Sequence, residues 1–182
     1  ARQAAWGRPT PDEVFELVFT SGTTGTPKGV MLTHDNVAAS IESFHRIIPP
    51  MDHRIVSVLP LSHMLEQAVV LYYALDVGAD VLYVRSRNPR VIFDALREHR
   101  VTSMIVVPQV LDLFWSAITR EVEKRGRTAS FDRLRSIARH LPPPVRRLLF
   151  RSVHAQLGGR FRLFLASGAF LPPALQQGWE DL

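Results

Sequence analysis

The stretch Thr20–Gly29, TSGTTGTPKG, is the most informative part of this chain. It holds three glycines, four threonines, a serine and a lysine between the apolar runs Val14–Phe19 and Val30–Leu32. Glycine lets a backbone bend tightly and approach a ligand, while exposed N–H groups, hydroxyls and an ammonium favour an anion. The pattern predicts two strands joined by a loop that binds a polyphosphate. A flexible hairpin turn without a ligand is the alternative interpretation.

This loop differs from a Walker A motif, which needs G-x-x-x-x-G-K-[ST] at the start of a helix. Here Lys28 lies between Pro27 and Gly29. We therefore expect a hairpin loop that folds over the phosphates, with Lys28 reaching them from its base. The string resembles the phosphate-binding loop of the adenylate-forming superfamily, which includes acyl-CoA synthetases, luciferases and the adenylation domains of peptide synthetases.

The composition is that of an ordinary globular protein of 182 residues, with 46% hydrophobic and 21% charged residues. The absence of cysteine excludes disulfides and thiolate metal sites. The longest apolar run, Ala68–Leu75, is too short to span a membrane, and no N-terminal signal pattern is visible. These features predict a soluble, cytoplasmic protein.

Positive charge is concentrated in residues 120–162, which hold twelve Lys or Arg against three Asp or Glu. A solvated helical face is one explanation. A surface that meets anionic lipid or an acidic ligand such as coenzyme A is another, and it would place the protein at the membrane periphery. Nucleic acid is disfavoured because this stretch lacks interleaved aromatic residues and any known binding motif.

Beyond the hairpin, short apolar segments alternate with amphipathic ones. This order predicts an α/β fold, with a mostly parallel sheet covered by helices on both faces. Residues 1–34 would form the N-terminal segment and the phosphate-loop hairpin, and residues 35–182 the β-α-β portion. The expected strands are 12–20, 29–33, 54–59, 80–84, 102–107 and 161–166; the expected helices are 36–48, 62–75, 89–99, 110–124, 131–140, 145–157 and one from about 172, with 126–130 as a loop.

Ligands of parallel sheets bind at the carboxyl ends of the strands. Four polar or breaker-rich segments follow expected strands: the loop 20–29, Pro60–His63, Pro108–Gln109 and Ser167–Ala169. We therefore expect these segments to form one site.

The segment Leu59–Gln67, LPLSHMLEQ, places His63 directly after a strand. It resembles the second signature of the adenylate-forming superfamily, in which a histidine lies between the phosphates and the acyl-substrate channel. An imidazole can donate to a carboxylate or phosphate oxygen and change rotamer as a site fills. A hydrogen-bonded histidine at a strand end, without a ligand role, is the alternative.

The segment Ala166–Leu171 resembles the small-residue turn against which the superfamily seats adenine. The resemblance assigns Ser167, Gly168 and Ala169 to adenine, although Phe170 stands where a proline is usual. A tight strand–helix turn without a ligand is the alternative. The segment VPQVLDLFW, which ends at Trp115, is most similar to long-chain fatty acyl-CoA synthetases. That branch commonly has arginine where this chain has Gln67 and Gln109, which weakens any anion contact there and leaves chain length open.

The resemblance implies an acid–thiol ligase that uses ATP, Mg²⁺ and coenzyme A. A fatty carboxylate would attack the α-phosphorus of ATP, and coenzyme A would then displace AMP from the acyl-adenylate. Lys28 and His63 would be catalytic, with His63 positioning the carboxylate and Thr23 contacting Mg²⁺. The residues implied at the β- and γ-phosphates are Thr20, Ser21, Gly22, Thr23, Thr24, Gly25 and Lys28.

Family enzymes continue with a metal-binding glutamate, a ribose-binding aspartate and a small C-terminal domain that carries a catalytic lysine. We therefore expect this chain to be a piece of the large N-terminal domain that cannot turn over alone. Two other function classes stay open. One is an adenylation enzyme with a different acid or acceptor, and the other is a non-catalytic module that binds nucleotide or anionic lipid. The oligomeric state is also left open.

Overall fold

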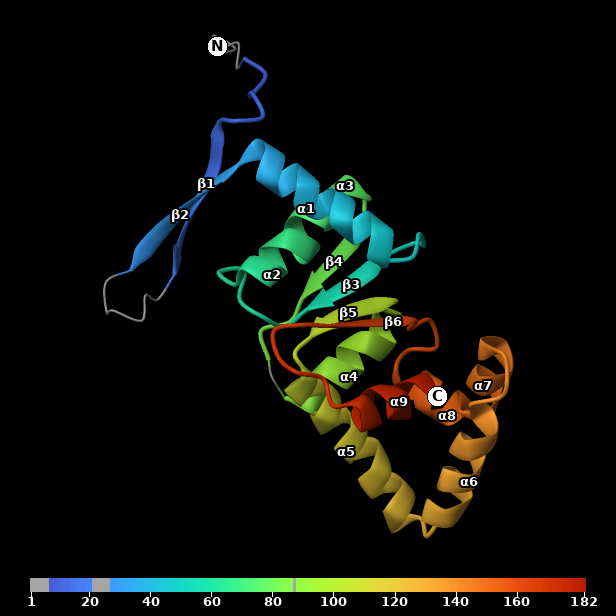
Figure 1. The fold of residues 1–182 in the computed structure, drawn as a ribbon. Helices are drawn as coiled ribbons and strands as arrows, with labels where there is room; N and C mark the ends of the chain where they lie inside the picture. The colour runs from blue at the N-terminus through green and yellow to red at the C-terminus, as the bar shows by residue number, and fades with distance from the viewer. Residues whose placement is uncertain (1–6, 21–26, 87) are drawn as a thin grey trace.

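A computed structural model describes residues 7–20, 27–86 and 88–182 (Figure 1). The predicted strand pair is present as an antiparallel hairpin of β1, Val14–Thr20, and β2, Lys28–Thr33. The hairpin projects from the rest of the molecule (Figure 1). Several of its apolar side chains are exposed, including Phe19 at 66% and Met31 at 68%. The hairpin is therefore anchored mainly at its end near α1.

Helix α1, His34–Ile47, begins directly after the hairpin because Thr33 caps it. The Thr33 hydroxyl accepts from the Asn36 amide, and the Asn36 side chain accepts from the Thr33 amide, which forms a capping box. Thr33 is therefore the N-cap residue of α1. The helix stops before Pro49 and Pro50.

The second sheet is parallel throughout, in the order β4-β3-β5-β6, as the alternating pattern predicted. Valine, isoleucine and leucine dominate its strands, which suits burial on both faces. The strands are β3, Arg54–Ser57; β4, Asp80–Tyr83; β5, Ser103–Val106; and β6, Leu163–Ala166.

Helices cover both faces of this sheet, each over its own apolar core (Figure 1). Ile55 and Ile105 face one core, and Val56 and Met104 face the other, because side chains alternate along a strand. The first core lies under α1, α2 (Met64–Glu66), η1 (Gln67–Tyr73) and α3 (Ala74–Asp76); the second lies under α4 (Pro89–Glu98), α5 (Pro108–Lys124) and α9 (Pro173–Glu180).

The predicted helix over 62–75 exists, but its middle part, η1, is a π-helix. Wider i→i+5 turns of this kind often occur at functional sites. Val69, Val70 and Tyr73 of η1 are buried against the sheet. The apolar run that the sequence shows at Ala68–Leu75 is thus a core-facing helix, and hydrophobic periodicity could not distinguish α from π winding.

Two predictions about the C-terminal part were wrong. Helix α6, Thr128–Ala138, begins within the expected loop 126–130. The expected helix 145–157 is two helices, α7, Pro143–Leu149, and α8, Arg151–Gln156, which meet at Phe150. Phe150 is buried and packs edge-on against Phe131 of α6. This burial turns the chain where the sequence alone predicted a continuous helix.

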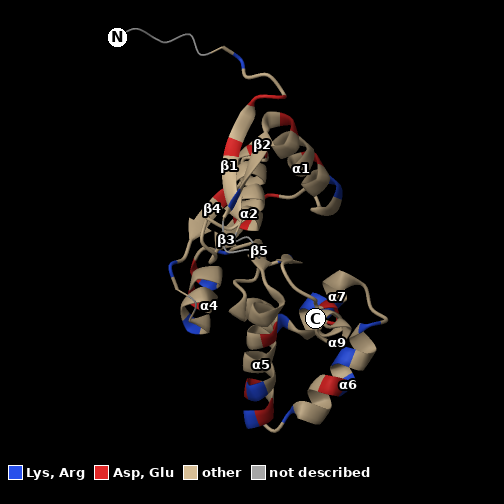
Figure 2. Ribbon diagram, turned by 60° about the vertical axis from the view of Figure 1, so that its left-hand side comes forward, with Lys and Arg blue, Asp and Glu red and all other residues tan. Residues whose placement is uncertain are grey.

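Figure 2 marks the Lys and Arg positions along α5 and α6, and several arginines of residues 120–162 have partners within the protein. Asp181, fully buried after α9, accepts hydrogen bonds from Arg135 at 3.0 Å and Arg139 at 3.0 Å. These contacts tie α6 to α9. Other arginines of this stretch bond to side chains or to carbonyl groups: Arg120, Arg125, Arg146 and Arg147. Among the described residues, every helix is too short or too polar to span a bilayer.

Candidate functional site

The base of the predicted phosphate loop is formed by Thr20 and Lys28. They are the last paired residues of the β1–β2 ladder, and the Thr20 hydroxyl donates to the Lys28 carbonyl at 3.4 Å. Both are exposed. Lys28 therefore lies at the entrance to the loop, as expected. The other loop residues assigned to phosphate or Mg²⁺ lie outside the described residues: Ser21, Gly22, Thr23, Thr24 and Gly25.

Aromatic contacts attach the hairpin to the body of the protein. The ring of Phe15 in β1 lies 5.0 Å from that of His34 and 5.3 Å from that of Tyr72, in both cases edge to face. His34 begins α1 and Tyr72 belongs to η1. The phosphate-loop hairpin is thus oriented by two helices that cover the same face of the parallel sheet.

His63 lies where the sequence predicted, in the turn that follows β3. Its backbone amide donates to the Pro60 carbonyl at 3.0 Å, and its own carbonyl accepts from Gln67 at 3.0 Å, which starts the helix. The imidazole is exposed. Sequence reasoning missed Glu66, three residues later, whose side chain is fully buried and accepts a hydrogen bond from Ser57.

The turn Ser167–Ala169 lies at the carboxyl end of β6, beside that of β5. The Ser167 amide donates to the Val106 carbonyl at 3.1 Å. Gly168 has a φ of +83°, which side-chain-bearing residues rarely adopt. A Cβ on Gly168 would come within 3.6 Å of Val107. That contact is ordinary, so the positive φ is what favours glycine here, and position 168 presents no side chain to a ligand.

A pocket of about 540 Å³ lies between the start of α5 and the segment 170–175, which follows this turn. Gln109, which the sequence singled out, lines this pocket. Phe170, which stands at the usual proline position, also lines it and is 80% exposed. Asp112 and Trp115 also line it. Sequence reasoning assigned neither residue to the site, because their shared pocket depends on how α5 packs against α9.

The three predicted parts of the site converge only loosely. The hairpin end, the His63 turn and the Ser167–Ala169 turn lie on the same side of the molecule (Figure 1). Within residues 7–20, 27–86 and 88–182, no hydrogen bond links one part to another. No cluster of three His, Asp or Glu side chains suited to a metal occurs in that part of the chain.

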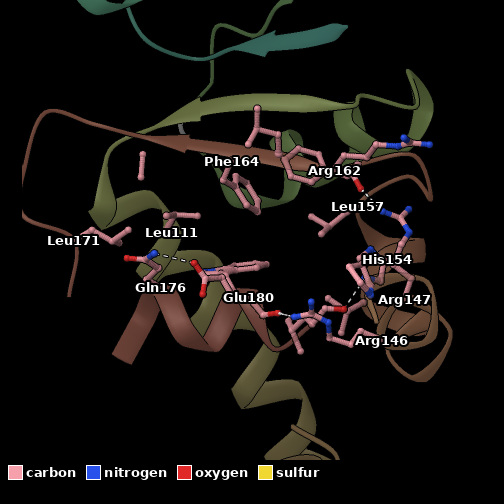
Figure 3. Close-up of a pocket in the computed structure, with 17 residues that line it drawn as sticks. Leu111, Arg146, Arg147, His154, Leu157, Arg162, Phe164, Leu171, Gln176 and Glu180 are labelled. Atoms are coloured by element: carbon pink, nitrogen blue, oxygen red, sulfur yellow. Dashed lines mark hydrogen bonds between the residues drawn. The ribbon is translucent and has the colours of Figure 1, made fainter. Parts of the chain in front are cut away.

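A cavity of about 630 Å³ lies elsewhere, between β6, α7, α8 and α9 (Figure 3). None of the predicted site residues lines it. Some of its polar groups have partners: Arg147 donates to the Phe161 and Gly159 carbonyls, and His154 contacts the Leu182 carbonyl at 3.0 Å. Others are buried without a hydrogen-bond partner among the described residues: Arg146 Nε, His154 Nδ1 and Trp179 Nε1. Because the motif residues lie at the carboxyl edge of the sheet and not at this cavity, we place the candidate site at that edge.

Comparison with known proteins gives a consistent result. The family model described as AMP-binding enzyme matches residues 3–182. Long-chain-fatty-acid–CoA ligase 6 of Mus musculus is 32% identical over 183 residues, covering 92% of this chain and 26% of that protein. Long-chain-fatty-acid–CoA ligase 1 of Homo sapiens is 32% identical over 174 residues, covering 88% of this chain and 25% of that protein.

Solved structures show the same fold. The inhibitor-bound N-terminal domain of FACL13 from Mycobacterium tuberculosis superimposes with a TM-score of 0.68 at 23% identity. The superposition covers 98% of this chain and 36% of that one. The chain thus spans about a quarter of the length of the curated relatives it matches.

Proposed function

This chain belongs to the AMP-binding enzyme family, and we propose that the whole protein joins a fatty carboxylate to coenzyme A with ATP. The carboxylate oxygen attacks the α-phosphorus and pyrophosphate leaves. The coenzyme A thiolate then attacks the acyl carbon of the adenylate, and AMP leaves. The observation that carries the proposal is the position of Lys28, at the open base of a hairpin loop, in a chain 32% identical to two long-chain fatty acid ligases.

Phosphorus chemistry of this kind depends mainly on positioning and charge stabilisation. In our proposal Lys28 and Thr20 hold the β- and γ-phosphates together with the loop residues 21–25, and Thr23 contacts Mg²⁺. His63 orients the attacking carboxylate, and Ser167–Ala169 seats adenine. The exposed Lys28 ammonium and the lack of a side chain at Gly168 support these assignments.

The acid is proposed to be a fatty acid because the two relatives are named as long-chain fatty acid ligases. The pocket between Trp115 and Phe170 has mostly apolar walls, which suits the carboxyl-proximal part of an acyl chain or an adenylate. A luciferase- or peptide-synthetase-like enzyme with another acid or acceptor is the alternative, and the pocket alone does not favour it.

Pyrophosphate exchange tests this proposal. We expect the full-length protein to exchange labelled pyrophosphate into ATP with fatty acids in the absence of coenzyme A, and to form thioester when coenzyme A is added. Exchange with amino or aryl acids but not fatty acids would contradict the substrate class. ATP binding without exchange for any acid would indicate a non-catalytic module.

We also propose that the basic region 120–162 contacts anionic membrane, which would make a cytoplasmic protein peripheral there. Part of α7 supports this: Val145 and Leu148 are 40% and 67% exposed, beside Arg146 and Arg147, whose guanidinium groups also bond to carbonyl groups of the protein. Apolar side chains flanked by cations suit a lipid interface. We expect Leu148→Glu to reduce co-sedimentation with phosphatidylserine vesicles, while Leu75→Glu, at an exposed site elsewhere, does not. If the wild type bound equally well to vesicles of phosphatidylcholine alone, this result would argue against a contribution of the positive charge to membrane binding.

A further inference from the structure

Glu66 is buried without a cationic partner in the described part of the chain. Its side chain has no exposed surface, although it lies in α2 only three residues after the exposed His63. A carboxyl group is almost never buried completely unless it is paired. The carboxyl group at position 66 must therefore make an interaction that an apolar side chain could not make.

The partner of Glu66 is the end of the strand that leads to it. The Ser57 hydroxyl donates to Glu66 Oε1 across nine positions of sequence, and Ser57 is itself buried. Ser57 is the last residue of β3, and Glu66 is the last residue of α2. The hydrogen bond thus closes the segment between them, which contains His63.

The backbone within this segment is held in the same way. The His63 amide donates to the Pro60 carbonyl, and the His63 carbonyl accepts from the amide of Gln67, next to Glu66. Glutamate at the third helical position commonly reaches back to the N-cap amide, but Glu66 instead reaches the strand. The imidazole of His63 is left exposed while its backbone is held at both ends.

Burial disfavours the charged form of this carboxyl group. Burial raises the pKa of Glu66, although the Ser57 hydroxyl, the Leu59 backbone and the charge of His63 each act to lower it. Oε2 is buried and has no hydrogen-bond partner among the described residues. Oε1 alone makes the contact to β3, so an amide oxygen at the same place could replace it.

We propose that Glu66 is the positioning residue for His63: with Ser57, its buried side chain closes the turn after β3 and so sets where the imidazole points. Glu66 itself does not touch substrate. The inference rests on the proposed function, in which His63 orients the reacting carboxylate. A displaced imidazole then lowers the rate of the chemical step more than it weakens ATP binding, because a misplacement of about 1 Å can cost on the order of 100-fold.

Two measurements on four variants test this. The first is the NMR signal of the His63 imidazole in the 182-residue chain, assigned with His63→Asn. The second is kcat and KM for ATP in fatty-acid-dependent pyrophosphate exchange by the full-length protein. The variants are Glu66→Ala, Glu66→Gln, Ser57→Ala and, as a control for loss of buried volume in the same helical segment, Val70→Ala.

We expect Glu66→Ala and Ser57→Ala to shift the His63 signal and to lower kcat by about tenfold or more, with KM for ATP changed less than about threefold. Glu66→Gln should restore both readouts, and Val70→Ala should leave the His63 signal in place. Ser57→Ala keeps the test decisive if Glu66→Ala does not fold.

An unchanged His63 signal in Ser57→Ala and Glu66→Ala would overturn the inference, as would a Glu66→Gln variant as defective as Glu66→Ala. Absence of exchange by the wild type would refute the proposed function instead. The NMR readout would still decide whether Glu66 positions His63.

Discussion

The hydroxyl of Tyr72 in η1 donates a hydrogen bond of 2.7 Å to Glu16 Oε2 in β1, across 56 positions of sequence. Together with the edge-to-face contact between Phe15 and Tyr72, this hydrogen bond attaches the hairpin to η1, which follows His63 and α2 in the chain. The contact raises the pKa of Tyr72 to about 12, through burial first and then through the hydrogen bond and charge of Glu16. Tyr72 thus links the β1–β2 hairpin to the body of the protein.

Tyr72→Phe should weaken ATP binding by a few-fold, because a neutral-to-charged hydrogen bond contributes about 1.5–3 kcal/mol at most and the ring contact is kept. Calorimetric titration with ATP measures this. Tyr83→Phe, at the half-exposed end of β4, is the control and should bind like the wild type. Full ATP affinity in Tyr72→Phe would show that the apolar contacts alone orient the hairpin.

The same contact predicts a pH dependence of stability. The folded state holds the Tyr72 proton more tightly than the unfolded chain, so its contribution is present below pH 10 and is lost as the pH rises towards about 12. The wild type should therefore lose more stability than Tyr72→Phe between pH 9 and about 11. Urea midpoints at several pH values measure the difference, and parallel curves for the two proteins would contradict it.

Lys28→Ala should reduce ATP affinity at least about tenfold, since a hydrogen bond between charged groups contributes roughly 1.5–3 kcal/mol. Lys124→Ala, at the far end of α5, removes the same charge away from the hairpin. Fluorescence titration with a labelled ATP analogue compares the two. Equal affinities for ATP in the Lys28→Ala and wild-type proteins would count against the phosphate assignment.

Gly158→Ala should destabilise the fold by more than about 2 kcal/mol, because two costs combine. Gly158 has a φ of +83°, and a Cβ there would overlap the Leu96 carbonyl oxygen of α4. The neighbouring Gly159 also has a positive φ, +72°, but a Cβ on it would meet nothing within 4 Å. Gly159→Ala therefore measures the free-energy cost of the positive φ alone, without the steric overlap. Denaturant unfolding should show the smaller loss for Gly159→Ala, and equal losses would refute the close approach of α4.

Asp181 should make the protein sensitive to acid. Burial alone raises the pKa of Asp181, but hydrogen bonds from Arg139 and Gln177 and the charges of Arg139 and Arg135 outweigh it, so the pKa lies below its usual value. The stabilisation is thus present above about pH 4 and is lost as the pH falls through the folded-state pKa.

Asp181→Asn should therefore lower the melting temperature at pH 7 and flatten its decline below pH 4. The expected cost at pH 7 is about 1–3 kcal/mol, since Arg135 loses a charged acceptor. Asp132→Asn, an exposed carboxylate 3.8 Å from Arg135, is the control and should change little. A melting curve of Asp181→Asn that keeps the wild-type dependence on pH would exclude this ion-pair group as the cause.

Several features of the protein follow from its local sequence. Glycine, proline and capping residues act over a few positions, so the hairpin, the start of α1 and the breaks at Pro49–Pro50 and 142–144 were predictable. The alternation of short apolar strands with helices was enough to predict a parallel sheet covered on both faces. The motifs at the strand ends were also sufficient to indicate the family.

Other features depend on residues far apart in the chain, and only the tertiary structure decided them. Residues 145–157 were expected to form one helix, but the chain turns at the buried Phe150, and Leu148 of α7 is exposed. The burial of Glu66 follows from the position of Ser57, and the direction of the hairpin from Tyr72 and Glu16. Local propensities and motifs do not predict such pairs, because the two residues come into contact only after the sheet and its helices have packed.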